Sequence, residues 1–258
     1  MKLIKIISAT LICLGLVTQV QAESALQDIL SNGVLKVGTT GDWNPMSVKD
    51  PATNSYKGYD IDVMTELAKD LGVEIEFVPA DWKTLLNGVV SGAYHLTGSA
   101  SISPSRAKAA GYSTSYFSLA TVPLILSKNA SKYKDWSDLN QSSVTVAATL
   151  GTTQEQQVKE YFPNAAHKIV DAPARDFQEV LAGRADAHIT SNVEAYKLVE
   201  KYPNMMIVPV SAPKSPTPVA MLLPQADQVW INYVNTWITL KQARGFFDEL
   251  GRKWKLSN

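Results

Sequence analysis

Apolar and polar positions in the first half of the chain alternate between a strand period and a helix period. Residues 34–38 are a short apolar run, and the segment 60–71 places apolar side chains at helical spacing before Gly72. The following segments are typical of a strand over 73–78, a helix over 82–91 and a strand over 94–98. This β-α-β-α-β order with short connections predicts a mostly parallel sheet flanked by helices.

A comparable series returns in the second half of the chain. It predicts strands over 144–148, 168–170 and 187–190. One helix is expected to start at 153 and a second to run over 174–182. Two such series indicate two α/β lobes instead of one long sheet. A long apolar strand over 120–127 and a proline-containing return over 210–221 connect them, and a strand over 221–223 and a helix over 225–245 complete the pattern.

The N-terminus has the pattern of an export signal. Two lysines precede an apolar run over 6–17, which is shorter than the roughly 20 residues that a membrane span needs. Val20-Gln21-Ala22 then supplies a cleavage pattern, so we expect residues 1–22 to be a signal peptide cleaved after Ala22 and the mature protein to be periplasmic. The one cysteine, Cys13, lies inside this segment, which excludes a disulfide scaffold, a thiolate nucleophile or a cysteine metal site in the mature chain.

Charge and residue types exclude further function classes. The chain carries 24 Lys and Arg against 24 Asp and Glu, and loss of the two signal lysines leaves a net charge of about −2. There is no basic stripe, so we expect no nucleic-acid partner. His95, His167 and His188 are too widely spaced to suggest a metal pair, and no glycine-rich phosphate loop is present. We therefore expect neither a metal nor a cofactor.

Two segments carry candidate chemistry. In 98–106, Gly-Ser-Ala-Ser-Ile-Ser-Pro-Ser-Arg, a strand end with several hydroxyls leads to Arg106 at the start of a helix. A guanidinium beside neutral donors offers a ligand carboxylate a bidentate, charge-assisted contact. Upstream, 57–62 reads Lys-Gly-Tyr-Asp-Ile-Asp, a turn glycine that leads into a helix with carboxylates in its first turn.

The two segments, in this order, resemble the periplasmic solute-binding proteins of family 3, the polar-amino-acid type. In that family a G-[FY]-D-[IV]-D element precedes a turn that carries an arginine. The resemblance implies the type II fold, in which a two-strand hinge joins two α/β lobes and the ligand lies between them. It implies a discontinuous first lobe over 23–121 and 217–258 and a second lobe over 122–216. The hydrophobic pattern alone leaves open two consecutive domains with a linker near residue 130.

The same resemblance implies the partners. A small carboxylate-bearing solute, an amino acid or an amino-acid derivative, would be captured between the lobes and delivered to the permease of an ABC importer. The binding protein itself is expected to be a monomer. Closure requires a ligand that touches both lobes, because only such a ligand binds the closed state more tightly than the open one.

Candidate ligand contacts follow from the motif positions that the family uses. Arg106 would hold the ligand carboxylate, Ser101 would add a hydroxyl and Ser99 a backbone carbonyl. The turn 150–154 resembles the family's G-T-T turn at a helix start, where Thr152 and Thr153 would meet the same carboxylate with help from the helix dipole. Trp43 and Trp82 occupy positions where aromatic side chains wall the site, although a core role for Trp82 is equally plausible from its pattern.

One position departs from the family pattern. After the intact Gly-Arg-x-Asp-Ala segment at 183–187, Ser191 stands where the family usually has an aspartate that pairs with the ligand's α-ammonium. Desolvating an ammonium against a neutral hydroxyl is unfavourable. The ligand is therefore expected either to lack a primary α-amine or to receive the missing charge from Glu194.

Glu194 also raises an enzymatic alternative. The chain resembles the cyclohexadienyl dehydratase branch of the family through 37–42 and through a glutamate at this position. In that branch the glutamate is a general acid toward the hydroxyl that leaves prephenate or arogenate. Ser191 and the segment 116–121 depart from that enzyme, and no second cation is evident for the second carboxylate of prephenate except Lys214. We therefore favour the solute-binding function and keep the dehydratase as the alternative.

Overall fold

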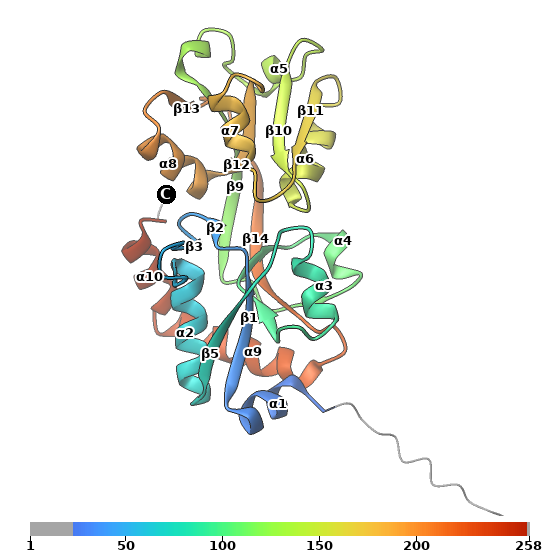
Figure 1. Cartoon of the computed structure of the whole chain (residues 1–258), viewed down its shortest axis with the longest axis vertical. Helices are drawn as coiled ribbons and strands as arrows, with labels where there is room; N and C mark the ends of the chain where they lie inside the picture. Colours follow the sequence, from blue (N-terminus) through green and yellow to red (C-terminus); the bar gives the residue numbers. More distant parts are fainter. Residues whose placement is uncertain (1–22, 257–258) are drawn as a thin grey trace, which may run out of the picture.

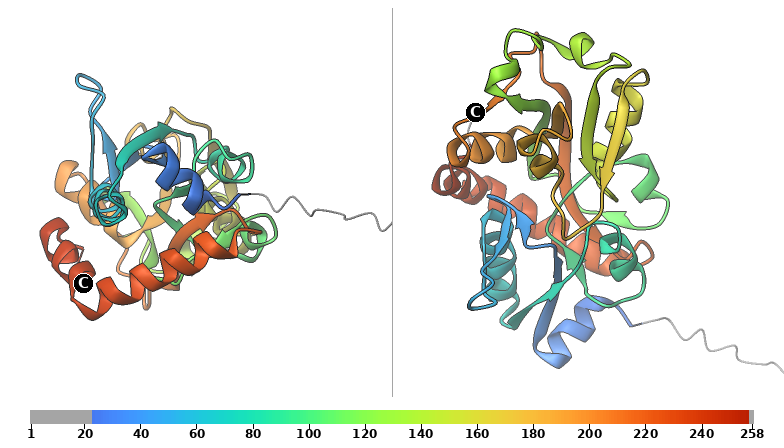
Figure 2. Two further views of the ribbon diagram at one scale, coloured as in Figure 1. Left: turned by 90° about the horizontal axis from the view of Figure 1, so that it is seen from below. Right: turned by 45° about the horizontal axis from the view of Figure 1, so that its top comes forward.

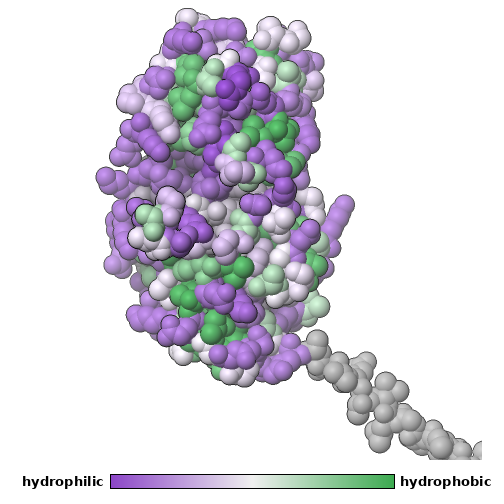
Figure 3. Space-filling model, in the orientation of Figure 1, coloured by the Kyte–Doolittle hydropathy of each residue, from purple (hydrophilic) through white to green (hydrophobic). Residues whose placement is uncertain are grey.

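The structure, a computed structural model, describes residues 23–256, so the expected signal peptide and its cleavage after Ala22 lie outside the described residues. Figure 1 shows two lobes, one above the other, connected by the long strands β9 (Phe117–Leu126) and β14 (Lys214–Leu223). This is the predicted two-lobed α/β fold with a two-strand hinge. On the face drawn in Figure 3, hydrophobic residues form separate patches among polar ones.

The lower lobe is built around β1 (Val34–Thr39), which pairs in parallel with β5 (Glu74–Pro79) and β6 (Leu96–Thr97). A small antiparallel sheet, which the sequence pattern did not predict, contains β2 (Asp42–Trp43), β3 (Ser47–Lys49) and β4 (Tyr56–Lys57). The helices are α1 (Ala25–Asn32), α2 (Tyr59–Leu71), α3 (Leu85–Val90) and α4 (Pro104–Ala107), and the remaining strands are β7 (Ser99–Ser101) and β8 (Gly111–Tyr112).

The upper lobe repeats this arrangement around β10 (Thr145–Thr149). It pairs in parallel with β11 (Ala166–Val170) and β12 (Ala187–Ser191). The helices of this lobe are η1 (Ser127–Asn129), α5 (Trp136–Leu139), α6 (Thr153–Tyr161), α7 (Asp176–Leu181) and α8 (Asn192–Lys201), and β13 (Met205–Ile207) pairs with β9.

The sheets are mixed, which corrects the expectation of mostly parallel sheets. The parallel pairs predicted from the β-α-β order lie at the centre of each lobe, but β9 runs antiparallel to β12, β13 and β14, and β14 runs antiparallel to β7 and β8. The physical reason is that a strand which leaves one lobe and a strand which returns to it must run in opposite directions. In β14 the register shifts between Lys214 and Thr217, next to Pro216, which has no N–H to donate to the ladder.

The C-terminal segment returns to the lower lobe. Figure 2 shows α9 (Gln228–Ala243) and α10 (Phe246–Trp254) in the same lobe as α1. One buried cluster combines side chains from 29–119 with side chains from 219–256 and includes Val193 of the upper lobe, whereas two other clusters draw on residues 122–208. This distribution favours the discontinuous first lobe over two consecutive domains, and the exact limits at 121/122 and 216/217 stay a prediction. The helix expected over 225–245 is α9, which runs from Gln228 to Ala243. α10 is a further helix that the sequence pattern did not predict, and Gly245 adopts a left-handed conformation between the two.

The start of α2 positions one wall of the space between the lobes. Gly58 has φ 145°, and a Cβ there would lie 2.2 Å from the carbonyl oxygen of Met46, so only glycine fits. Two residues later Asp60 is buried under β7. Along the helix Met64 and Leu67 are fully buried, and each contributes about 1.5–3 kcal/mol of apolar burial to the stability of this lobe.

Candidate functional site

One cavity between the lobes brings together all nine side chains that the sequence analysis proposed as ligand contacts. The cavity contains about 500 Å³ of space outside protein atoms, part of it open to solvent. The lower lobe supplies Trp43, Trp82, Ser99, Ser101 and Arg106, and the upper lobe supplies Thr152, Thr153, Ser191 and Glu194. Most of these residues lie at or just after the carboxyl ends of strands, where α/β folds form ligand sites. Their contact with a ligand stays a prediction.

Arg106 is placed by α4 and reaches across the gap between the lobes. Its guanidinium donates to the carbonyl of Ser101 at 3.3 Å and to the carbonyl of Gly151 in the upper lobe at 3.2 Å. No carboxylate within residues 23–256 lies at ion-pair distance from it. Burial lowers the pKa of Arg106, and the neighbouring Tyr112 partly offsets this effect. The site therefore contains a partly buried cation without an anionic partner among the described residues.

The start of α6 faces Arg106 from the other lobe. The hydroxyl of Thr152 caps the helix, since it accepts from the amide of Glu155 at 3.2 Å and donates to the carbonyl of Thr149 at 2.6 Å. The first amides of a helix have no acceptor within the helix. Those of Thr153 and Gln154 at this helix start are therefore suited to an anion held by Arg106.

The two tryptophans form an aromatic wall. Their ring centroids are 5.7 Å apart at 74°, an edge-to-face arrangement. The indole of Trp43 donates to the hydroxyl of Ser191 at 3.4 Å, and the indole of Trp82 donates to Asp42 at 3.0 Å. Behind them a second recess of about 350 Å³ extends into the lower lobe as far as Asp60. Trp82 thus lines the cavity and also packs against the core, which combines both interpretations of its pattern.

Glu194 is part of an ion network that sequence reasoning did not find. Its carboxylate accepts from Arg175 at 2.7 Å and from the hydroxyl of Thr190 at 2.5 Å. The same guanidinium lies 3.0 Å from a carboxylate oxygen of Asp42 in the lower lobe and also donates to its backbone carbonyl. Both oxygens of Glu194 therefore already have donors.

Arg175 corrects the expectation that the cavity lacks a second cation. It lines the cavity, whereas Lys214 does not and instead lies over the rings of Trp136 and Tyr161, at 5.5 and 4.6 Å from their centroids. Burial lowers the pKa of Arg175, but the carboxylates of Glu194 and Asp42 more than offset this, so the pKa is raised.

A buried Asp–His pair extends the network. His188 Nδ1 lies 3.0 Å from Asp176 Oδ2, and both side chains line the cavity with almost no exposure. Burial by itself raises the pKa of Asp176, and the interactions with His188 and Arg175 reverse this, so its pKa lies below the usual value. Among the described side chains, His188 Nε2, Arg175 Nε and the hydroxyl of Thr149 are buried without a hydrogen-bond partner, although all three residues line the cavity. Such groups are typical of a site that awaits a polar ligand.

Ser99 is held from behind. Its amide and hydroxyl both donate to the carboxylate of Asp60, at 3.1 and 2.6 Å, and its hydroxyl lies 3.0 Å from that of Tyr116. Burial raises the pKa of Asp60 to about 7, although the two hydrogen bonds from Ser99 lower it. The hydroxyl and the amide of Ser99 thus serve the lobe's interior, and contact of its backbone carbonyl with a ligand stays a prediction.

Further contacts hold the lobes together around the cavity. Lys83 pairs with Asp171 at 2.7 Å, and Gln156 donates to Ser105 at 3.2 Å. Gly151, at φ 81°, lies so close to the loop of the other lobe that a Cβ would be 2.6 Å from the backbone of Lys83. The chain is therefore in a closed arrangement with direct lobe-to-lobe contact.

Arg175, Asp176 and His188 are cavity residues that the sequence did not point to, and all three lie in or just after parallel strands of the upper lobe. Arg175 and Asp176 come five and six residues after the end of β11, and His188 lies in β12. The helix expected over 174–182 contains the first two, and the spacing of the histidines gave His188 no role in the site. Because β11 is parallel to β10, the loop after its carboxyl end was a candidate for the site. Across residues 23–256 no cluster of His, Asp or Glu fits a metal ion, and no helix is long and apolar enough to cross a membrane.

Comparison with known proteins gives the chain a family. A cyclohexadienyl dehydratase from Pseudomonas aeruginosa is 28% identical over 248 residues, which cover 95% of this chain and 92% of that protein. The ABC transporter glutamine-binding protein GlnH of Bacillus subtilis is 26% identical over 239 residues, covering 90% and 85%. A solved structure of an ancestral amino acid-binding protein, AncCDT-1, described as a precursor of cyclohexadienyl dehydratase, matches with a TM-score of 0.83 at 35% identity and covers 90% of this chain and 99% of its own.

These similarities confirm the resemblance inferred from the two motifs, including its closeness to the dehydratase branch. The profile of the bacterial extracellular solute-binding proteins, family 3, matches residues 35–257, which is most of the chain. This protein belongs to the bacterial extracellular solute-binding proteins, family 3.

Proposed function

We propose that the protein captures a small amino acid or amino-acid derivative through its carboxylate, closes around it, and delivers it to the permease of an ABC importer. In this proposal it acts as a monomer in the periplasm after loss of residues 1–22. The amino-acid-binding relatives support the solute class and the transport role. The nine cavity residues named from the sequence are the proposed contacts.

The observation that carries the proposal is the state of Arg106. A buried charge is costly unless an opposite charge and hydrogen bonds compensate it. Within the described part of the chain, Arg106 donates to two carbonyls, one from each lobe, and no carboxylate pairs with it. A ligand carboxylate placed against Arg106 and the start of α6 would compensate the charge and touch both lobes at once, which favours the closed state.

The end of the cavity near Arg175 carries a net negative charge, whereas the end at Arg106 is positive. Asp42 and Glu194 share the single guanidinium of Arg175, so this group carries one negative charge in excess. A ligand with a carboxylate at one end and a cation at the other therefore matches both ends. Ser191 does not supply the carboxylate usual in the family, so the cation on the ligand is either an amine held near this network or a more distant group.

A thermal-shift screen tests the proposal. Free L-amino acids, N-substituted amino acids and keto acids with matched side chains would be compared, because a ligand of the native state raises the melting temperature by mass action. We expect at least one carboxylate-bearing compound to stabilise the protein, and Arg106→Ala to abolish that shift. If keto acids stabilise as well as their amino acids, the ligand needs no amine. A screen in which amides and esters bind as well as free acids would overturn the carboxylate requirement.

One observation supports the second candidate, cyclohexadienyl dehydratase. Arg175 gives the cavity the second cation that prephenate, with two carboxylates, would need, and a dehydratase is among the curated relatives. Against it, a general acid must present a proton to the leaving hydroxyl, and both oxygens of Glu194 accept hydrogen bonds from Arg175 and Thr190. We therefore expect no catalysis in the arrangement seen here.

A product assay separates the two functions. Prephenate and arogenate would be incubated with the protein at neutral pH and followed for phenylpyruvate and phenylalanine. We expect no product above the uncatalysed rate. Product formation that disappears in Glu194→Gln, while the variant still binds the substrate, would establish the dehydratase instead.

A further inference from the structure

A second groove lies on the outer side of the Arg175–Glu194 pair. It contains about 600 Å³ of space outside protein atoms, part of it open to solvent, which gives room for a small molecule. Arg175 and Glu194 line both this groove and the inner cavity, so their ion pair is the partition between the two spaces. Asp42 and Asn44 of the lower lobe complete the outer groove, which therefore exists as a closed shape only while the lobes are together.

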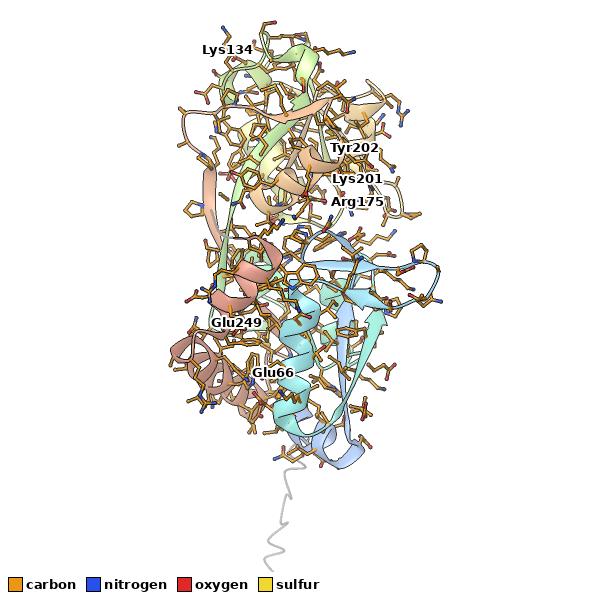
Figure 4. The ribbon with its side chains drawn as sticks, turned by 90° about the vertical axis from the view of Figure 1, so that its left-hand side faces the viewer. Glu66, Lys134, Arg175, Lys201, Tyr202 and Glu249 are labelled. Carbon is orange, nitrogen blue, oxygen red and sulfur yellow. The ribbon has the colours of Figure 1, made fainter. Side chains whose placement is uncertain are left out.

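The groove combines aromatic walls with positive charge. The rings of Phe177 and Tyr202 are 5.7 Å apart at 37°, and Leu198 adds an apolar surface beside them. Lys197 and Lys201 project from α8 one helical turn apart. Figure 4 labels Arg175, Lys201 and Tyr202 together on one side of the upper lobe, above the boundary between the lobes.

The charges favour an anion over a cation. Asp42 and Glu194, the two carboxylates of the groove, are both occupied by Arg175. Lys197 has one exposed partner, Glu200, at 3.2 Å. For Lys201 no carboxylate of the described chain lies at ion-pair distance, and its ammonium lies 5.3 Å from the ring centre of Tyr202. Three cations against two carboxylates leave the lining one charge positive.

We propose that this outer groove is a second binding site, specific for a small aromatic carboxylate. The carboxylate pairs with Lys201, with Lys197 close by, and the ring packs against Phe177 and Tyr202. Aromatic pairs of this kind are stabilised beyond the burial of apolar area alone. Because the groove needs residues from both lobes, its ligand stabilises the closed arrangement independently of the solute in the inner cavity.

The test uses phenylacetate as the probe and amide NMR shifts as the readout. Titrations would run in the Arg106→Ala variant, so that carboxylate binding in the inner cavity is removed and a failure there is not confused with a failure of the groove. We expect phenylacetate to shift the amides of α8 and of residues 175–177, and to leave those of 151–154 unchanged. Acetate and 2-phenylethylamine, which keep only the charge or only the ring, should bind at least about tenfold more weakly, a loss of about 1.4 kcal/mol each.

Two variants locate the contact. Lys201→Glu should weaken phenylacetate at least about tenfold, whereas Lys134→Glu, the same change at an exposed lysine at the far end of the same lobe (Figure 4), should not change its affinity. Equal effects of the two variants would show a general surface charge effect and overturn the site. Equal binding of 2-phenylethylamine, or no shift on α8 up to about 20 mM phenylacetate, which exceeds the Kd of a ligand that gains about 4 kcal/mol, would overturn it as well.

Discussion

The two walls of the inner cavity differ in how their charges are compensated. In the lower lobe Arg106 is a partly buried cation that donates to carbonyl oxygens and has no carboxylate partner among residues 23–256. In the upper lobe Arg175 is shared between Glu194 and Asp42, and Asp176 is paired with His188. A charge without an internal partner gains most from a ligand, whereas a compensated network already stabilises the protein on its own. The comparison therefore predicts that one wall determines affinity and the other determines stability.

The largest effect is expected at Arg106. Arg106→Ala should weaken binding of the best carboxylate ligand by about 2–5 kcal/mol, at least thirtyfold, because the ligand carboxylate loses its charge-assisted partner. The free energy of unfolding of the ligand-free protein should stay equal or rise, since the variant removes an uncompensated buried charge. Isothermal titration calorimetry and urea unfolding measure the two quantities. The comparison fails if the dissociation constant does not change.

This wall is also the part of the site that the sequence predicted best. The segment 98–106 places a strand end, a proline and one arginine in an order whose chemistry can be worked out locally, and the family resemblance supplies its role. The upper wall was harder to predict. The Arg175–Asp42 contact joins residues 133 positions apart, and the Asp176–His188 pair joins a helix start to a strand interior. Neither pairing has a local signature, because the first forms only when the two lobes close and the second only when the upper lobe folds.

The same contrast applies to the fold. The parallel pairs around β1 and β10 follow from short β-α-β periods, and the sequence predicted them. The antiparallel pairing of β9 with β14 joins distant parts of the chain, and the hydrophobic pattern indicated only a proline-containing return over 210–221. Local periodicity thus predicts each lobe, whereas the two-strand hinge between the lobes followed from the family resemblance.

At Arg175 we expect the reverse of the Arg106 result. Arg175→Ala leaves the carboxylates of Glu194 and Asp42 without a counter-charge in a mostly buried place, and loss of one partner of such a pair costs about 3–5 kcal/mol. The free energy of unfolding in urea should fall by about 3 kcal/mol. Arg175→Ala/Glu194→Gln should recover part of this loss, because it removes one of the stranded charges. No change in stability would show that this wall is not a structural network.

Whether ligand binding needs the close contact between the two walls of the cavity can be tested without changing any charge. Gly151→Ala places a Cβ 2.6 Å from the backbone of Lys83, so the upper wall must move away. Gly183→Ala is the matched control: Gly183 has a similar φ of 71°, but its Cβ would meet nothing within 4 Å. In both variants the left-handed backbone at the new alanine lowers the free energy of unfolding by about 1–2 kcal/mol. We expect only Gly151→Ala to weaken ligand binding, by about tenfold to a hundredfold, because it opposes closure. Equal binding by both variants would mean that closure does not need this contact.

The last effect is a pH dependence, and it concerns the support behind the lower wall, where Asp60 holds Ser99. Burial raises the pKa of Asp60 to about 7 in the folded protein, against an ordinary value of 3.8. Between these values the folded chain keeps a proton that the unfolded chain has released. The stability from this group is therefore fully present below about pH 4 and is lost as the pH rises through 7, at up to about 1.4 kcal/mol per pH unit. Asp176 has the opposite sign, since its lowered pKa makes its contribution disappear only as the pH falls below about 4.

Urea unfolding at pH 5, 6, 7 and 8 measures this difference between the walls. Other groups titrate in the same range, including His95, whose pKa burial lowers, so the informative quantity is the difference between the protein and Asp60→Asn. An asparagine can still accept a hydrogen bond from the amide of Ser99, and it carries no charge to desolvate. We expect the variant to gain stability relative to the unchanged protein as the pH rises from 5 to 8. Asp62→Asn, two positions along α2 where the carboxylate pairs with Lys253 at an exposed site, should show no such trend. Parallel curves for all three proteins would show that Asp60 is charged throughout this range and that the lower wall does not respond to pH.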